Sequence, residues 1–98
     1  MNSVVASSTL FGQRPHEGRF QITVEIGTPY HTGVDWACPV ELKPLYPRLA
    51  DVHGVDSLQA LCLAVSLAKS LLSGFRHDQG VLTNNDGAQA SLDYLGFE

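Results

Sequence analysis

Residues 19–26 carry the most regular hydrophobic pattern in the chain. Apolar and polar side chains alternate there with a period of two, and the apolar set is Phe20, Ile22, Val24 and Ile26. A period of two places all the apolar side chains on one face of a strand. A strand with one wet face is typical of an antiparallel sheet, because strands of a parallel sheet are covered on both faces. We therefore expect a strand over about 19–27 in an antiparallel sheet.

Two further segments have strand character. Residues 34–43 alternate in the same way, with Trp36, Cys38, Val40 and Leu42 on one side. Pro39 has no amide hydrogen for a ladder, so this strand is expected at a sheet edge or with a bulge at Pro39. Residues 3–11 predict a weaker strand, because their serines make either face plausible. The glycine-bounded segments 12–18 and 27–33 supply the turns between the three strands.

A long helix is predicted over about 57–78. Asp56 is a suitable N-cap, and Gln59, three residues later, can complete a capping box. Apolar residues at helical spacing form two neighbouring stripes, Leu58, Leu61, Val65, Ala68, Leu72 and Phe75 in one and Ala60, Ala64, Leu67 and Leu71 in the other. Because Phe75 continues the first stripe, we expect the helix to stop near Gly80, with that glycine as the left-handed terminator.

The apolar surface of this helix is wider than one face of a small sheet would bury. The two stripes together cover roughly half of the circumference, against an arc of about 100° in most surface helices. Cys62 and Leu63 add apolar surface near the polar side. Two interpretations stay open: a curved sheet and the tail of the chain cover the helix, or the helix also contacts a second chain. At roughly 20 residues, with several serines, we expect it to be too short and too interrupted for a membrane span.

These elements predict an α+β fold, in which a three-stranded antiparallel meander packs on one long helix in the C-terminal half of the chain. A fourth short strand near residues 81–82 is an alternative, and residues 44–55 are expected to be irregular. We expect residues 1–98 to form a single domain. The C-terminal segment 81–98 is expected to be partly docked or mobile, and the order of residues 84–91 stays open because Asn-Asn-Asp-Gly fits either a turn or a mobile loop.

Three sequence blocks carry a resemblance to a known family. The blocks are Ile-Gly-Thr-Pro-Tyr at 26–30, Asp-Trp-Ala-Cys-Pro-Val at 35–40 and Gly-Val-Asp-Ser-Leu-Gln-Ala-Leu at 54–61. Over residues 19–97 the chain resembles a family of small bacterial domains of unknown function. The resemblance implies a bacterial origin, a short meander followed by one long helix, and a Leu-Gly-Phe-like ending. It implies no activity, so no catalytic residue is carried over.

The charge of the chain limits the classes of partner that it can bind, and its cysteines indicate the cellular compartment. The net charge is −4, and the six basic residues balance the acids up to Arg76, so that the acidic excess follows it. No basic cluster exists to neutralise phosphates, so we expect no nucleic-acid partner, and anionic membrane surfaces are disfavoured for the same reason. Cys38 and Cys62 fall in a predicted strand and the predicted helix, where we expect reduced, near-core thiols of a cytoplasmic protein.

The sequence offers no constellation that favours catalysis or a metal. The four histidines are scattered, and no paired ligand spacing such as Cys-x-x-Cys is present, so we expect neither a metal nor a cofactor. Neither cysteine lies where a thiolate would be stabilised. There is no nucleophile elbow and no phosphate-binding glycine loop. We therefore expect no catalytic residues, and a small enzyme remains the minority alternative.

A binding surface is the remaining hypothesis. His53 and Asp56 are the sharpest polar cluster, either a pair at the lip of a pocket near Trp36 or Tyr46, or a helix cap with a loop histidine beside it. The candidate surface residues are Tyr30, His31, Trp36, Tyr46, His53, Leu63 and Tyr94. The leading hypothesis is a noncatalytic module that binds an unidentified protein partner. The alternatives are a homodimer closed by the helix, and a ligand-binding or enzymatic domain with a pocket near His53 and Trp36.

Overall fold

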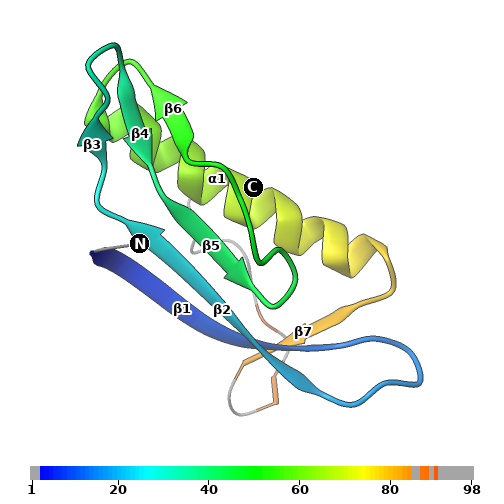
Figure 1. Ribbon diagram of the computed structural model, residues 1–98. Coiled ribbons are helices and arrows are strands. Elements are labelled where there is room, and N and C mark those ends of the chain that lie inside the picture. Colours follow the sequence, from blue (N-terminus) through cyan, green and yellow to red (C-terminus); the bar gives the residue numbers. More distant parts are fainter. Residues whose placement is uncertain (1–2, 85–86, 89, 91–98) are drawn as a thin grey trace.

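The computed structural model describes residues 3–84, 87–88 and 90 of the chain. In chain order its elements are β1 (Val4–Gln13), β2 (Phe20–Gly27), β3 (Tyr30–His31), β4 (Trp36–Cys38), β5 (Val40–Lys43), β6 (Val52–Gly54), α1 (Ser57–His77) and β7 (Val81–Thr83). The strands form one layer and α1 lies behind it, so the fold is α+β, with its helix in the C-terminal half (Figure 1).

The predicted three-stranded meander is wrong in detail, because the strands divide into two antiparallel sheets. The larger sheet has the order β5-β2-β1-β7, and the smaller has the order β3-β4-β6. Two of the short strands, β3 and β6, fall in segments expected to be a turn and irregular chain. Each is held by a neighbour on β4, which pairs with β3 on one side and β6 on the other. Such short strands have too few residues to show a period of two, so the sequence pattern could not reveal them.

The two sheets share one long, bent hairpin. Ile26 pairs with Val40 and Tyr30 pairs with Ala37, so residues 27–29 face residues 38–39 and one arm has an extra residue. Pro39 lies at this irregularity: its carbonyl accepts from the Gly27 amide at 2.9 Å, but it has no amide hydrogen to continue the ladder. The predicted strand over 34–43 is therefore divided into β4 and β5, and β5 lies at the edge of the larger sheet.

The core lies between the strands and one narrow face of α1. The fully covered residues of the helix are Ala60, Ala64, Ala68, Leu72 and Phe75, which lie along the junction of the two predicted stripes. Leu61, Val65, Leu67 and Leu71 flank this face and are partly buried against the core. Leu58, predicted in the buried stripe, is 67 % exposed. The small alanines let the helix approach closely: a Cβ on Gly54 would lie 2.6 Å from the Ala60 backbone nitrogen.

The helix begins as predicted and ends differently. Asp56 is the N-cap, with a side-chain oxygen accepting from the Gln59 amide at 2.7 Å. The Gln59 side chain accepts in turn from the amide of Val55, one residue before the cap, at 2.7 Å. At the other end Gln79, not Gly80, has the left-handed conformation, with φ of 67°. The Gly80 amide donates to the Phe75 carbonyl at 3.0 Å, so the predicted terminator is wrong by one residue.

Gly80 is required for space rather than for its φ angle. A Cβ at this position would lie 2.4 Å from a carbon of the Phe75 ring. The ring is also fixed by an edge contact with Phe20, at a centroid distance of 5.9 Å. The chain can thus turn from α1 into β7 directly over Phe75.

By length and composition α1 is sufficient to cross a membrane, contrary to the expectation that it is too short and too interrupted. The core helix of a folded domain passes the same test, and α1 has a face packed on the strands.

Candidate functional site

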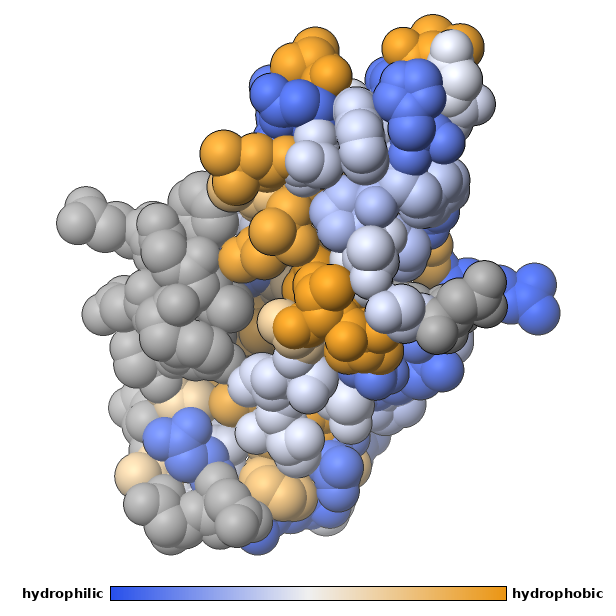
Figure 2. All heavy atoms as spheres, turned by 90° about the vertical axis from the view of Figure 1, so that its left-hand side faces the viewer, coloured by the Kyte–Doolittle hydropathy of each residue, from blue (hydrophilic) through white to orange (hydrophobic). Residues whose placement is uncertain are grey.

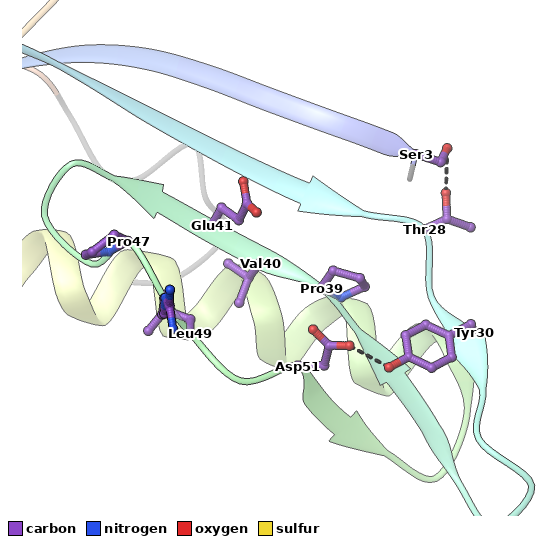
Figure 3. A pocket seen from close by; sticks show the side chains of 10 residues that line it. Ser3, Thr28, Tyr30, Pro39, Val40, Glu41, Pro47, Leu49 and Asp51 are labelled. Carbon is purple, nitrogen blue, oxygen red and sulfur yellow. Dashed lines mark hydrogen bonds between the residues drawn. The ribbon is translucent and has the colours of Figure 1, made fainter. Parts of the chain in front are cut away.

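A surface pocket of about 600 Å³ opens where the bent hairpin meets the connection between β5 and β6. Figure 3 shows its wall of labelled side chains, with Pro39 and Val40 between Tyr30 on one side and Pro47 and Leu49 on the other. The lining residues are Ser3, Thr28, Tyr30, Pro39, Val40, Glu41, Pro47, Arg48, Leu49 and Asp51. We call this the hairpin pocket. Its volume lies in the range of about 300–1,000 Å³ that is usual for ligand sites.

Tyr30 and Asp51 form the polar side of the hairpin pocket. The Tyr30 hydroxyl donates to Oδ2 of Asp51 at 2.5 Å. This hydrogen bond, with a smaller contribution from burial and the Asp51 charge, raises the pKa of Tyr30 above its usual 10.0. Tyr30 therefore stays a neutral donor, and Asp51 is the acceptor. The two residues meet because β4 holds β3 on one edge and β6, which Asp51 precedes, on the other.

Two more charged residues border the pocket. Glu41 has a carboxylate oxygen 3.3 Å from Lys43 Nζ on the same strand. Arg48 lines the pocket, and its side chain makes no ion pair or hydrogen bond with the residues that the structure describes. At the N-terminal rim the Thr28 hydroxyl donates to the Ser3 hydroxyl at 3.0 Å, which ties β1 to the hairpin. The pocket thus combines carboxylate acceptors, guanidinium donors and the apolar surfaces of Pro39, Pro47 and Leu49.

A second polar cluster lies at the far end of the hairpin. His53 Nδ1 lies 3.0 Å from Oδ2 of Asp35, and Thr32 donates to Oδ1 of Asp35 at 2.7 Å. The Thr32 hydrogen bond first, and the His53 hydrogen bond second, hold the pKa of Asp35 below its usual 3.8. The structure therefore gives His53 a different partner from Asp56, whose carboxylate caps α1. The cluster is an exposed turn held together by its own side chains.

The predicted surface residues are dispersed over the molecule. Tyr30 lines the hairpin pocket, whereas His53 and Trp36 do not. Trp36 packs against the core and meets the His31 ring edge-on, at a centroid distance of 5.4 Å. Tyr46 is exposed and forms an isolated bridge with Leu42, and Leu63 is 44 % exposed on α1.

One predicted surface residue, Tyr94, lies outside the described residues.

The sequence did not single out the charged residues of the hairpin pocket. Asp51 and Arg48 belong to residues 44–55, whose turns and prolines give no periodic pattern. Glu41 lies on the polar side of the alternating pattern over 34–43, which marks it only as a solvent-facing residue of a strand. Two prolines, Pro44 and Pro47, lie between the strands, and such prolines are typical of a surface loop with a restricted conformation. They are the feature of the sequence that could have indicated a site here.

The two cysteines differ in environment. Cys38 is buried, donates from Sγ to the Gly27 carbonyl at 3.3 Å, and has a pKa raised by burial and by the nearby Asp51 charge. Cys62, expected near the core, is exposed on the outer side of α1. Both are free thiols. Within residues 3–84, 87–88 and 90, no group of three His, Cys, Asp or Glu side chains is placed to hold a metal ion.

Fold and site together define a small α+β domain with a bent hairpin, one core helix and an open pocket at their margin. Residues 9–94 match the family model described as "Domain of unknown function (DUF6968)", and the chain belongs to this family. The predicted relationship to a family of unknown function is thus confirmed at that level. No curated protein and no solved structure matches the chain.

Proposed function

We propose that this domain is a noncatalytic protein-interaction domain, and that its hairpin pocket binds an extended partner segment through one lysine or arginine side chain. The observation that carries the proposal is the placement of Asp51 beside the apolar surfaces of Pro39, Pro47 and Leu49 in one open pocket. A basic side chain has an aliphatic stem and a charged head. The stem needs an apolar surface and the head needs an acceptor at the end of that surface.

Asp51 has the free capacity that such a ligand requires. Tyr30 occupies Oδ2, and Oδ1 accepts no hydrogen bond from the part of the chain that the structure describes. A carboxylate has about four acceptor positions, so a cationic donor can bind without displacing Tyr30. The hydrogen bond from Tyr30 also fixes the carboxylate in place before the ligand arrives, which lowers the entropy cost of binding.

The presence of Arg48 in the pocket favours a peptide as the ligand over an isolated amine. Its guanidinium has five donors and no partner within the described residues, so it can donate to carbonyl groups or to a carboxylate of the partner. Tyr30 is 45 % exposed, and tyrosine is among the residues that carry most of the binding energy in protein interfaces. A pocket with both acceptors and donors fits the main chain and one basic side chain of an extended segment.

The test is a titration followed by amide NMR, with the blocked tripeptide acetyl-Ala-Lys-Ala-amide as the probe. We expect saturable shifts at the amides of Tyr30, Glu41 and Asp51, and none for the matched peptide with norleucine in place of lysine. Asp51→Asn should remove the response. The control Glu25→Gln removes an equal charge from β2, outside the pocket, and should keep it. Equal shifts with the norleucine peptide, or a full response in Asp51→Asn, would contradict the proposal.

A second candidate, a homodimer, is favoured by one specific observation. Val34, Val55 and Leu58 are 93 %, 78 % and 67 % exposed. Trp36 pairs with Gly54, which brings the turns that carry Val34 and Val55 to the same end of the small sheet. Figure 2 shows hydrophobic surface at the upper end of the molecule.

Solution mass tests this candidate. Light scattering after size exclusion, at two protein concentrations, should give a dimer for the native chain and a folded monomer for Leu58→Lys. Leu63→Lys tests the outer side of the helix in the same way. A native monomer at both concentrations would contradict the homodimer.

A further inference from the structure

We propose that the lysine or arginine bound in the hairpin pocket is the last residue of the partner, with its side chain on Asp51 and its free α-carboxylate on Arg48. This inference rests on the proposed function and deepens it, because it states which part of the partner enters the pocket. One guanidinium and one carboxylate line the pocket together, and neither has a charged partner among the residues that the structure describes.

The charged residues of the hairpin pocket differ in how far the protein itself compensates them. Glu41 has its carboxylate 3.3 Å from Lys43 Nζ, so its charge is balanced within β5. Asp51 accepts from the neutral Tyr30 hydroxyl, which fixes the carboxylate but leaves its charge uncompensated. Arg48 forms no ion pair within the described part of the chain. The complementary ligand therefore has one positive and one negative charge.

The two uncompensated charges come from different ends of one short stretch of chain. Figure 3 shows this stretch running from Pro47 past Leu49 to Asp51, whose carboxylate points at Tyr30. Arg48 follows Pro47 directly, and Asp51 is the third residue after it, so their Cα atoms are at most about 11 Å apart. A lysine has its carboxylate and its ammonium at the two ends of a four-carbon stem. One lysine and its two hydrogen bonds, each about 2.8 Å long, can join such a pair.

The surface between the two charges suits the stem of the same residue. Pro39, Pro47 and Leu49 line the pocket, and Leu49 is half-buried against the core. The two prolines have no amide hydrogen, so they add no backbone donor to this part of the wall. An aliphatic stem can cover them without leaving a polar group unpaired. The polar contacts are thus left to the two ends of the ligand.

A lysine inside a chain fits this arrangement less well than a terminal one. Its carbonyl is neutral and leaves the charge of Arg48 uncompensated. A terminal carboxylate accepts from two guanidinium N–H groups at once, and such a bidentate, charge-assisted pair is stronger than a hydrogen bond to a carbonyl. Free lysine has a further ammonium beside its carboxylate, and no second uncompensated carboxylate lines the described part of the pocket for it. The ligand is therefore the C-terminus of a peptide chain.

Titration of the native chain at pH 7, followed by amide NMR, tests the inference with two peptides that differ only at the terminus. They are acetyl-Ala-Lys with a free carboxylate and acetyl-Ala-Lys-amide, both at the same ionic strength. We expect the free acid to have a Kd lower by about tenfold or more, because it adds a hydrogen-bonded pair of charges. The net charge of −4 favours the more cationic amide at long range, so it does not produce this preference.

The outcomes separate this inference from the proposed function. The free acid should also shift the Arg48 Nε–Hε resonance, and the amide should leave it in place. Equal dissociation constants, or tighter binding of the amide, would overturn the inference and leave the proposed function standing. Absence of binding for both peptides would overturn the two together. Tighter binding of free lysine than of acetyl-Ala-Lys would assign the pocket to the free amino acid and overturn the inference as well.

Variants of Arg48 identify the group that reads the carboxylate. Arg48→Gln should abolish the preference for the free acid and change the Kd of the amide much less. Arg48→Lys keeps the charge without the guanidinium fork and should retain part of the preference. Arg76→Gln removes the same charge at the end of α1, outside the pocket, and should retain all of it. Full preference in Arg48→Gln would overturn the inference, and because Arg48 is exposed this variant tests binding rather than folding.

Discussion

Asp35, one residue before β4, lies beside His53 of β6, with His53 Nδ1 3.1 Å from Oδ1 and 3.0 Å from Oδ2 of the carboxylate. Asp35 also belongs to the turn at the end of the hairpin, where the Thr32 backbone amide donates to the Asp35 carbonyl at 2.8 Å. The contact between His53 and Asp35 therefore fixes this end of the hairpin. His53 is thereby a structural partner of the turn and does not line the hairpin pocket.

The Asp35 cluster predicts a pH-dependent contribution to stability. Its pKa is lowered in the folded state, so the contribution is present above the usual value of 3.8 and is lost as the pH falls through the lower, folded pKa. The stability difference between the native chain and Asp35→Asn should therefore shrink in acid below pH 3.8. Urea unfolding at several pH values measures it.

Thr32 should have the larger influence on that carboxyl group. Its hydroxyl is the first cause of the lowered pKa and His53 the second. We expect Thr32→Val to raise the pKa of Asp35 more than His53→Ala does, and Thr32→Ser to leave it nearly unchanged because the hydroxyl is retained. Carboxyl ¹³C titration by NMR gives each value. A larger rise in His53→Ala would contradict the assignment.

The Tyr30 phenol should titrate at lower pH once its acceptor is removed. The Asp51 hydrogen bond is the main cause of its raised pKa, so Asp51→Asn should bring the pKa back toward 10.0. Because the folded pKa is the higher one, the stabilising contribution of the neutral phenol is present below pH 10.0 and is lost as the pH rises through the folded pKa. Titration of the Tyr30 ring by NMR measures the change, with Glu41→Gln as the control on the same pocket.

Gly54 and Gly74 should respond to alanine in opposite directions. A Cβ at Gly54 would lie 2.6 Å from the Ala60 nitrogen and 3.0 Å from its Cα, so β6 or α1 must move. We expect Gly54→Ala to lower the free energy of unfolding by about 1–3 kcal/mol, as in other overpacked sites. Gly74 has no neighbour within 4 Å of such a Cβ, and Gly74→Ala should raise stability by up to about 1 kcal/mol through helix propensity. Urea denaturation measures both, and destabilisation by Gly74→Ala would contradict the account.

The cap of α1 gives a matched pair of variants. The Asp56 side chain accepts from the Gln59 amide at 2.7 Å, so Asp56→Ala should cost about 1 kcal/mol of stability. Asp56→Asn keeps the acceptor oxygen and should be close to the native chain. Thermal unfolding distinguishes them. Equal loss in both variants would show that the charge, rather than the hydrogen bond, stabilises the helix start.

Local patterns sufficed for the long elements. The period of two over 19–26 located β2, and Asp56 with the apolar spacing after it located α1, because both signals arise between residues near in sequence. The proline at 39 marked the bend in the hairpin for the same reason: its missing amide is a property of one residue.

The tertiary structure decided what local patterns could not contain. Two-residue and three-residue strands such as β3 and β6 exist because β4 lies between them. The buried face of α1 is centred on Ala60, Ala64 and Ala68, rather than on the leucines, because the sheet approaches where side chains are small. The hairpin pocket joins Tyr30 to Asp51, 21 residues apart in sequence, and only the pairing of both flanking strands to β4 brings them together. Sequence by itself determined the long strands and the helix, because their signals are local, and packing between distant segments determined the short strands and which side chains form a site.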